Sequence, residues 1–564
     1  MSRLTGGGRA LPLLATVTLT ACASLPTSGP VHIGLEGAVV EEPYVQAVAA
    51  PPVAGASLEQ IVQGFLQAML AGATDDFKVA RSYLDGETAA VWDATASVIV
   101  YQSGDVPLLA ESETEPGEVA LTLQQVGAVD AVGRYTAQAP APATLTLRLS
   151  QDGDGEWRIS ELPDGSAIPV DVFNVDYVAA PIYFPSADGQ FLVPDRRVFR
   201  RQSAATEAAR EFLAGPPQYL RGAVASVAPA GARLETDSVK VVDGVAVVNL
   251  SAAMADASES VRATMLSCLT HTLTSLPTVR SVELHVADVP LEVSAAPGLT
   301  EDPSAAGGPF YLGDGGVWEH DGVRGALLSG TEAALAWETL SVDHSMTRFA
   351  GLVGGALQVI AKPGADLVEV ELLGGGPATA PPMFDRLGAL WVATGGLVAV
   401  YNTEGEATIV SATWLESSRV VALAPSRDGA RLALALQDPD SDVTRLVVTG
   451  IVRRQGAVPW RLTAPLEAGL MAGPVSSLNW EDGLTLTMLA PLQAGGEPTP
   501  AVFTVGGDLS YLLPPTDPPA SLASGRTAEE IYTAGSAGGL FSYSPRGRVW
   551  TSLGGGARAV TFAP

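Results

Sequence analysis

The fold of the C-terminal half is decided by a stretch that reads Ala424-Pro425-Ser426-Arg427-Asp428-Gly429-Ala430-Arg431-Leu432-Ala433-Leu434. Apolar residues on both sides of a Ser-Arg-Asp-Gly turn predict two short strands joined by a tight turn. Related segments recur at spacings of roughly 40 to 60 residues, which is the period of propeller blades. They lie at 312–318, 384–391, 478–486 and 543–550, with a fainter one at 342–353.

We therefore expect residues 305–564 to form an all-β propeller of about five or six blades. Short apolar runs alternate with Gly, Asp and Pro turns here, and no long amphipathic helix is visible. The Ser-Arg-Asp-Gly and Ser-Pro-Arg-Gly turns resemble those of periplasmic propellers. A pair of β-sandwiches is the alternative, because the spacing of the repeats is irregular.

Upstream of this region the sequence predicts an α+β domain over residues 57–165. Ser57 and Gln60 have the spacing of a capping box, and the apolar residues that follow share one face of a helix that is expected to end at Gly72. Strands are expected next, at 98–101, 119–126, 135–137, 144–149 and 157–159. Helices followed by an antiparallel meander resemble the cone fold of the nuclear-transport-factor-like superfamily. Residues 166–194 are expected to be a connector.

A second α+β unit is predicted over residues 195–295. It comprises a helix at 204–213, a β-hairpin that turns at Asp243-Gly244, a helix whose apolar face includes Cys268, and a closing strand at 282–286. Three phrases closely resemble the GerMN domain, namely Phe212-Leu213-Ala214-Gly215-Pro216-Pro217, the hairpin from Val241 to Leu250, and Leu273-Thr274-Ser275-Leu276-Pro277-Thr278-Val279. That resemblance implies a small module that binds rather than catalyses.

The N-terminus has the order of an export signal. Arg3 and Arg9 precede an apolar run at 10–19 that is well short of the ~20 residues a bilayer requires. Leu19-Thr20-Ala21-Cys22 follows, which matches the bacterial lipobox. We expect residues 1–21 to be a lipoprotein signal peptide, Cys22 to become an S-diacylglycerol and N-palmitoyl cysteine, and 22–56 to be the lipidated tether. This arrangement predicts a protein held by its lipid at the extracytoplasmic face of the cell membrane.

Charge and cysteine content exclude several classes of protein. The net charge of −29 argues against binding to nucleic acid or to anionic lipid headgroups. Cys268 is the second of two cysteines, so no intramolecular disulfide is available once Cys22 is acylated. Packing alone must stabilise the domains, and Cys268 itself is expected to be inert core.

No catalytic constellation, cofactor motif or metal site stands out in the sequence. The five histidines show no HExxH spacing, and His271 and His285 are expected at solvated positions. The acidic segments 152–156 and 438–442 suggest calcium, but neither has the full set of EF-hand ligands, so acidic hairpin turns are expected. We therefore predict no catalytic residue, no metal and no cofactor.

The lipobox, the Cys22-Ala23-Ser24-Leu25-Pro26 opening, the Leu192-Val193-Pro194-Asp195 segment, the GerMN unit and the propeller together resemble the actinobacterial LpqB lipoproteins. The resemblance implies a non-enzymatic accessory of a two-component system that contacts the extracytoplasmic domain of the MtrB sensor histidine kinase. It further implies a role in envelope homeostasis and division. The alternative is a cell-wall glycan-binding or glycan-processing protein that uses the propeller channel. Carboxylates converging at the channel mouth would favour the enzyme, whereas small apolar residues would favour the accessory.

Overall fold

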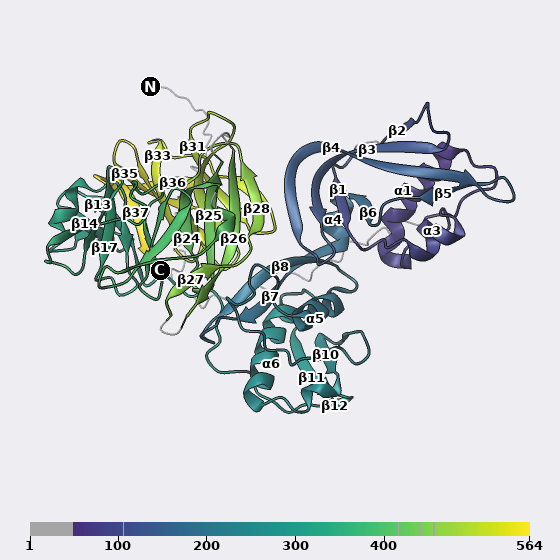
Figure 1. Ribbon diagram of the computed structural model, residues 1–564, viewed down its shortest axis with the longest axis horizontal. Coiled ribbons are helices and arrows are strands. Elements are labelled where there is room, and N and C mark those ends of the chain that lie inside the picture. The colour runs from purple at the N-terminus through teal and green to yellow at the C-terminus, as the bar shows by residue number, and fades with distance from the viewer. Residues whose placement is uncertain (1–48, 105–106, 416, 439–442, 455–456) are drawn as a thin grey trace, which may run out of the picture. The chain divides into compact units, whose positions relative to one another are not determined.

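The computed structural model describes residues 49–104, 107–415, 417–438, 443–454 and 457–564 (Figure 1). Cys22, the signal peptide and most of the tether lie outside these residues. Within them, no helix is both long and apolar enough to cross a bilayer. The described chain consists of mixed α/β regions followed by an all-β region, as the sequence predicts.

The first region packs helices against an antiparallel sheet. Its elements are α1 (Leu58–Asp75), α2 (Lys78–Arg81), α3 (Gly86–Val91), β1 (Val98–Tyr101), β2 (Leu108–Glu111), β3 (Glu118–Val129), β4 (Tyr135–Gln151), β5 (Trp157–Glu161) and β6 (Ser166–Pro169). The strand order is β5-β4-β3-β1-β6, with β2 on β3 and with β6 parallel to β1. Helix α1 lies against β5 and β6, and α3 lies against β5 (Figure 1). Ile61 and Phe65 of α1 are buried against Leu121, Leu147 and Ile159 of the sheet.

The capping box at Ser57 and Gln60 is confirmed, but the predicted end of the helix is wrong. Helix α1 continues past Gly72 and ends at Asp75, with Asp76 in the left-handed conformation as its C-cap. Gly72 serves packing instead, because a Cβ there would lie 2.2 Å from the ring of Phe77.

Two strands predicted at 135–137 and 144–149 form one long strand, β4. The sequence breaks the pattern with Pro140 and Pro142, which usually interrupt a sheet. They are tolerated because β5 pairs only with residues 148–151. In the proline-containing part of β4, one side pairs with β3 and the other side has no strand paired with it. The strands β2 and β6 were not predicted; β2 is largely exposed, and β6 ends in Pro169.

The second region combines a hairpin, two helices and a sheet. Its elements are α4 (Val170–Asp176), β7 (Tyr177–Pro185), β8 (Leu192–Arg200), α5 (Ala204–Ala214), β9 (Lys240–Val242), β10 (Val245–Leu250), the 3-10 helix η1 (Ala252–Met254), α6 (Glu259–Thr274), β11 (Ser281–Val286) and β12 (Val289–Pro290). Strands β12-β11-β10-β9 form the sheet, and α6 links the parallel strands β10 and β11. The predicted helices, hairpin and closing strand are therefore present.

Residues 166–194, expected as a connector, instead contain β6, α4, β7 and the start of β8. Strand β7 pairs with β8 and packs on α5 and α6. Ala180, Ile182 and Phe184 of β7 are buried in the same core as Phe212 and Leu269. Strand β7 therefore belongs to the core of the second region, whereas β6 is an edge strand of the first sheet.

The C-terminal region consists of six antiparallel sheets, so the prediction of five or six blades is confirmed. The first blade contains β13 (Gly307–Gly313), β14 (Gly316–His320), β15 (Gly325–Leu327) and, from the C-terminus, β37 (Ala559–Ala563). The second contains β16 (Ser341–Val342), β17 (Phe349–Val353), β18 (Ala356–Ile360) and β19 (Leu367–Val370). The third contains β20 (Met383–Phe384), β21 (Leu390–Thr394), β22 (Leu397–Tyr401) and β23 (Ala407–Ile409).

The fourth blade contains β24 (Arg419–Pro425), β25 (Arg431–Gln437), β26 (Thr444–Arg453), β27 (Pro459–Leu462) and β28 (Leu466–Met471), the last two both paired with β26. The fifth contains β29 (Ser476–Trp480), β30 (Thr485–Pro491), β31 (Pro498–Thr504) and β32 (Leu509–Tyr511). The sixth contains β33 (Pro519–Ser524), β34 (Ile531–Gly535), β35 (Gly539–Ser544) and β36 (Val549–Gly555). Short 3-10 helices η2 (Glu332–Ala336), η3 (Thr413–Leu415) and η4 (Ala528–Glu530) lie in connections.

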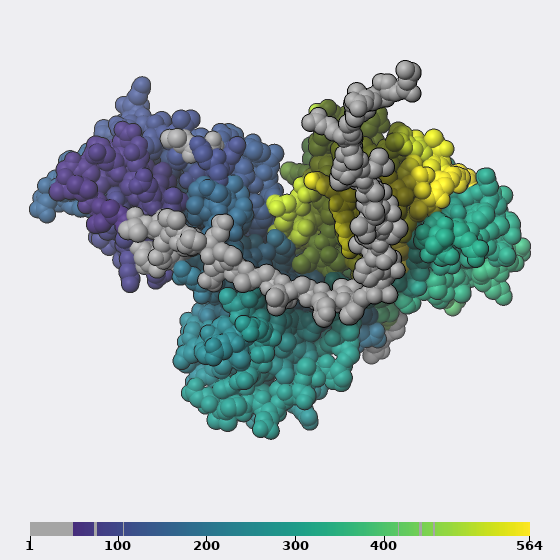
Figure 2. Space-filling model, turned by 180° about the vertical axis from the view of Figure 1, so that it is seen from behind, coloured from purple at the N-terminus to yellow at the C-terminus, as the bar shows by residue number. Residues whose placement is uncertain are grey.

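The propeller is closed by pairing the two ends of its sequence. Strand β37 pairs with β13, so the C-terminal strand is the innermost strand of the first blade. Inner strands β37, β16, β20, β24, β29 and β33 contact one another in a closed ring. Figure 2 shows the same closure, with the yellow C-terminal residues beside the teal residues that begin the propeller.

The predicted repeat is correct in kind but not in every position. The segments at 342–353, 384–391, 424–434 and 478–486 each join the inner strand of a blade to its second strand. In contrast, 312–318 joins β13 to β14, and 543–550 joins β35 to β36. In the first blade the inner strand comes from the C-terminus, and in the sixth the inner turn holds η4 rather than an Asp-Gly turn. These two differences produce the irregular spacing.

Candidate functional site

The central channel of the propeller is a cavity of about 130 Å³ lined by all six inner strands or the residues next to them. The lining combines apolar side chains, such as Leu340 and Met383, with small and hydroxyl-bearing ones, such as Ser477 and Thr561. Among the described residues that line it, Glu338 carries the one carboxylate, and its Oε1 accepts a hydrogen bond from the backbone N–H of Gly354 at 3.2 Å. The described residues of the channel therefore include no pair of carboxylates of the kind that glycoside hydrolysis ordinarily uses.

The end of the propeller that carries the inner turns is in contact with the second region. Arg386, in the inner turn of the third blade, forms an ion pair with Asp188 between β7 and β8. In the fifth blade, the backbone N–H of Gly483 donates to the carboxylate of Asp302. Antiparallel strands place the turns between second and third strands, and the links from one blade to the next, at the opposite end. There Leu335, Leu492 and Leu513 are 49%, 66% and 74% exposed.

A buried polar cluster connects β8 to the fourth blade. Asp195 pairs with Arg197 at 2.6 Å, and all but a few per cent of each side chain is buried. Arg431, 1% exposed, pairs with Asp428 and donates to the carbonyl of Pro194 at 3.2 Å. Its guanidinium also lies 4.7 Å from the ring centroid of Trp480. Each charge is matched, as buried charges must be.

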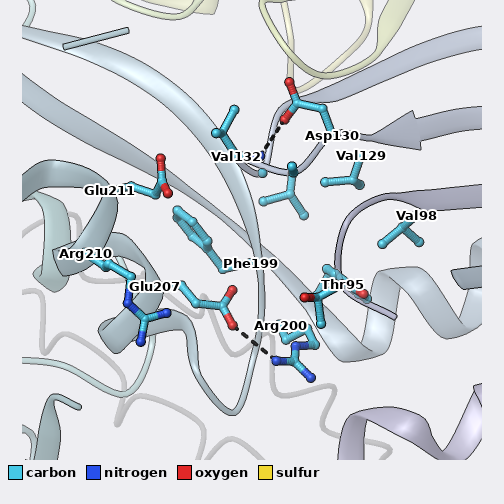
Figure 3. A pocket seen from close by; sticks show the side chains of 14 residues that line it. Thr95, Val98, Val129, Asp130, Val132, Phe199, Arg200, Glu207, Arg210 and Glu211 are labelled. Atoms are coloured by element: carbon cyan, nitrogen blue, oxygen red, sulfur yellow. Dashed lines mark hydrogen bonds and ion pairs between the residues drawn. The ribbon is translucent and has the colours of Figure 1, made fainter. Parts of the chain in front are cut away.

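A polar pocket of about 200 Å³ lies where the loop after β3 meets β8 and α5 (Figure 3). Arg200 and Glu207 face each other across 3.6 Å, and the carboxylate of Asp130 accepts from the backbone N–H of Val132 (Figure 3). Arg210 pairs with Asp237 at 2.9 Å, and Arg197 with Glu211 at 3.3 Å. Burial raises the pKa of Glu211. Since its charges are paired within the protein, this pocket offers little unmatched charge to a ligand.

Of the two acidic segments that suggested calcium, 152–156 is described in full and has a structural role. Asp152 Oδ1 accepts hydrogen bonds from the backbone N–H groups of Asp154 and Glu156, each at 3.0 Å, so this segment is a hairpin turn between β4 and β5. Residues 439–442 lie outside the described residues. Elsewhere in the described chain, no group of three or more His, Cys, Asp or Glu side chains is arranged to hold a metal ion.

Cys268 is fully buried, as expected, and burial raises the pKa of its thiol to about 12. The two histidines differ from expectation, because neither is an exposed residue. His271 Nδ1 lies 2.9 Å from the carbonyl oxygen of Ser267, and its ring meets Tyr183 edge-on. His285 Nε2 lies 3.7 Å from the carboxylate of Glu283.

The polar cluster at β8 was not predicted. A signal for it exists in the sequence, since Asp195, Arg196 and Arg197 interrupt an otherwise apolar strand from Leu192 to Phe199. The partners Asp428 and Arg431 belong to a turn whose composition suggested only a blade anchor.

Three family models match consecutive parts of the chain. "Lipoprotein LpqB, N-terminal domain" matches 51–174, "Sporulation and spore germination" matches 181–292, and "Lipoprotein LpqB beta-propeller domain" matches 315–561. Among solved structures, TolB from Acinetobacter baumannii is 10% identical, with a TM-score of 0.33 over 70% of this chain and 86% of that one.

Curated relatives named Lipoprotein LpqB agree with these matches. The protein of Cutibacterium acnes is 34% identical over 49% of this chain and 46% of its own length, so that alignment spans less than half of the relative. The protein of Bifidobacterium longum is 28% identical over 78% of this chain and 77% of the relative. That of Thermobifida fusca is 27% identical over 88% and 91% respectively. With the three domains matched in order, the chain belongs to the LpqB lipoprotein family.

Proposed function

We propose that this protein is a membrane-anchored, extracytoplasmic and non-enzymatic accessory of an MtrB-like sensor histidine kinase, acting in cell-envelope homeostasis and division. The observation that carries the proposal is the propeller channel, in which apolar and hydroxyl-bearing side chains surround Glu338, the one carboxylate among the described lining residues. Membership of the LpqB lipoprotein family supports the same conclusion, because the matched family descriptions name no catalytic activity. The alternative of a glycan-processing enzyme has no carboxylate pair in this channel to support it.

Anchoring is proposed to rest on Cys22. Acylation at this thiol would hold the domains within a thin layer above the membrane, which raises their effective concentration near any membrane protein there. Cys22→Ala is expected to leave the protein unprocessed or to release it, and fractionation of cells that make the variant measures this. Mature-sized Cys22→Ala protein still firmly in the membrane would contradict the anchor.

Docking onto a kinase requires an accessible surface, and two are available. One is the end of the propeller opposite the inner turns, where Leu492 and Leu513 are exposed. The other is the GerMN sheet, whose two opposite edge strands, β9 and β12, carry Val242 and Val289 at 60% and 65% exposure. Exposed apolar side chains are among the groups that protein interfaces bury.

The direct test is binding of residues 57–564 to the extracytoplasmic domain of the cognate kinase, measured by calorimetry at low and moderate salt. Because the chain carries −29, we expect a neutral or basic partner surface and slower association as salt rises. Two matched double variants locate the interface: Leu492→Lys with Leu513→Lys on the propeller, and Val242→Lys with Val289→Lys on the GerMN sheet. All four positions are exposed, so folding is expected to survive.

One double variant is expected to weaken binding at least tenfold while the other binds as the parent does. If the parent does not bind the kinase domain and turns over a cell-wall glycan, the accessory function is wrong and the enzymatic alternative replaces it. If both variants bind as the parent does, docking uses neither of these surfaces.

A further inference from the structure

A larger cavity, of about 410 Å³, lies between the first domain, strand β8 and the propeller. Its size is within the range of small-molecule sites. Three arginines line it: Arg134 from the start of β4, Arg196 from β8, and Arg431 from the fourth blade. Three guanidinium groups around one cavity are notable in a protein whose net charge is −29.

Arg196 has no matching negative charge in direct contact. Its Nη1 donates to the carbonyl oxygen of Gly506, a neutral partner. Among the described residues no carboxylate oxygen forms an ion pair with it, although Asp508 is near enough to act through its field. Burial lowers the pKa of Arg196, and the nearby Asp508 opposes that shift.

The other two arginines each retain an unused donor. The Nε atoms of Arg134 and Arg431 are buried and have no hydrogen-bond partner. Arg134 has one ion-pair partner, Asp130, at the long distance of 3.7 Å. Buried donors without partners are uncommon and cost free energy, so an acceptor that reached them would be favoured.

The carboxylates around the cavity are already engaged. Asp195 accepts from Arg197 at 2.6 Å and from the hydroxyl of Tyr219 at 2.9 Å. Glu467 pairs with Arg445 at 2.9 Å. Asp130, the third carboxylate of the lining, pairs with Arg134 and accepts hydrogen bonds from the backbone N–H groups of Val132 and Arg134. Arg196 is therefore the charged group of the lining that has no direct ion-pair partner among the described residues. The rest of the wall is largely apolar, with Pro465, Leu466, Ala468, Leu484 and Val505.

We propose that this cavity binds a small organic acid, whose anionic oxygens meet Arg134 and Arg196 and whose short apolar part lies against Leu466 and Val505. The anionic group is a carboxylate or a phosphate, since guanidinium groups recognise both. The site is independent of kinase docking. A ligand here touches all three parts of the protein, so binding stabilises their folded arrangement.

The test uses residues 49–564 and four probes: hexanoate, hexyl phosphate, hexanol and inorganic phosphate. Calorimetry and thermal melts are expected to show binding of hexanoate or hexyl phosphate at least tenfold tighter than that of hexanol. The comparison of these two acids identifies the anionic group. Inorganic phosphate is expected to bind more weakly than hexyl phosphate, and equal binding would show that the apolar wall plays no part.

Arg196→Gln and Arg134→Gln are each expected to weaken binding of the acid at least tenfold. Arg546→Gln is the matched control. The side chain of Arg546 is 90% exposed, forms a surface ion pair with Glu529 and does not line the cavity. Without ligand, Arg196→Gln is expected to melt no lower than the parent, since it removes an uncompensated charge. This separates a binding role from a structural one. Acids that bind no tighter than hexanol, or that bind parent and arginine variants alike, would overturn the proposal.

Discussion

The hydroxyl of Tyr219 donates a hydrogen bond to the carboxylate of Asp195 across 2.9 Å, and at least 95% of each residue is buried. Burial raises the pKa of Tyr219 well above its usual value, so the hydroxyl remains a donor at every ordinary pH. The carbonyl of the same Tyr219 accepts from Thr463 of the propeller. One residue therefore connects β8 and the GerMN region to the fourth blade.

Tyr219→Phe is expected to lower the free energy of unfolding by about 1–3 kcal/mol, because it removes one hydrogen bond from a buried carboxylate. Chemical denaturation of residues 49–564 measures the change. Tyr311→Phe is the control, since the Tyr311 hydroxyl forms no hydrogen bond with a described residue, and removing this hydroxyl should cost less than about 0.5 kcal/mol. Equal stability of the two variants would mean that the Tyr219 hydrogen bond contributes nothing.

The turn between β9 and β10 gives a second prediction. Asp243 and Gly244 have φ values of +51° and +79°, as a two-residue hairpin turn requires. A Cβ at Gly244 would also lie 3.2 Å from the side chain of Arg280. Gly244→Val should therefore cost roughly 1–3 kcal/mol, and Gly244→Asn less, because Asn tolerates positive φ. Thermal melts compare the two, and an unchanged midpoint for Gly244→Val would contradict the strained turn.

Glu481 gives a prediction about pH. It is 7% exposed, its Oε2 has no hydrogen-bond partner, and burial raises its pKa from 4.5 to about 7, with Asp482 adding to the rise and Arg427 opposing it. The folded protein therefore holds a proton that the unfolded chain releases between these pH values. The contribution of Glu481 to stability is therefore full below about pH 4.5, is lost as the pH rises through about 7, and amounts to about 3 kcal/mol.

Glu481→Gln is expected to abolish this loss, so that the variant is more stable than the parent at pH 8 and similar to it at pH 4.5. Denaturation at several pH values measures the difference, and the exposed Glu404→Gln serves as control. A parent-minus-variant difference that does not change with pH would show that Glu481 is ionised in the folded protein throughout this range.

Local sequence patterns predicted most of the helices, strands and turns, because the residues that determine these elements are close together in the sequence. The capping box at Ser57, the Asp243-Gly244 hairpin and the Asp-Gly turn at 428–429 each depend on a few neighbouring residues. The errors arise where distant contacts decide. Gly72 avoids the ring of Phe77 rather than ending a helix, and the proline-rich middle of β4 is tolerated because no strand pairs with that edge.

The cavity lined by Arg134, Arg196 and Arg431 was beyond sequence analysis for the same reason. Each arginine belongs to a different part of the chain, and although Arg431 lies in a blade repeat, nothing in the sequence relates it to Arg134 and Arg196. Whether an arginine is matched depends on the three-dimensional positions of Asp130, Asp195 and Asp428, which no spacing reveals. The channel lining was likewise hidden, since it takes one or a few residues from each of six inner strands.

Closure of the propeller gives the last prediction. Strand β37 supplies the inner strand of the first blade, and Val560, 5% exposed, pairs with Tyr311 and packs on Ala523 and Ala534 of the sixth blade. Val560→Asp places an unpaired charge at the junction of these blades and should cost about 3 kcal/mol or more. Thr551→Asp, on the exposed surface of the outer strand β36, introduces the same charge without that burial.

Deleting residues 558–564 should have a larger effect than either substitution, because it exposes the backbone of β13 and leaves the ring open. Denaturation monitored by tryptophan fluorescence and by circular dichroism is expected to show an early or broadened transition for the deletion and for Val560→Asp, and a nearly unchanged one for Thr551→Asp. If the deletion unfolds as cooperatively and as late as the parent, then β37 is not what closes the propeller, and the first blade must be stable with β13, β14 and β15 alone.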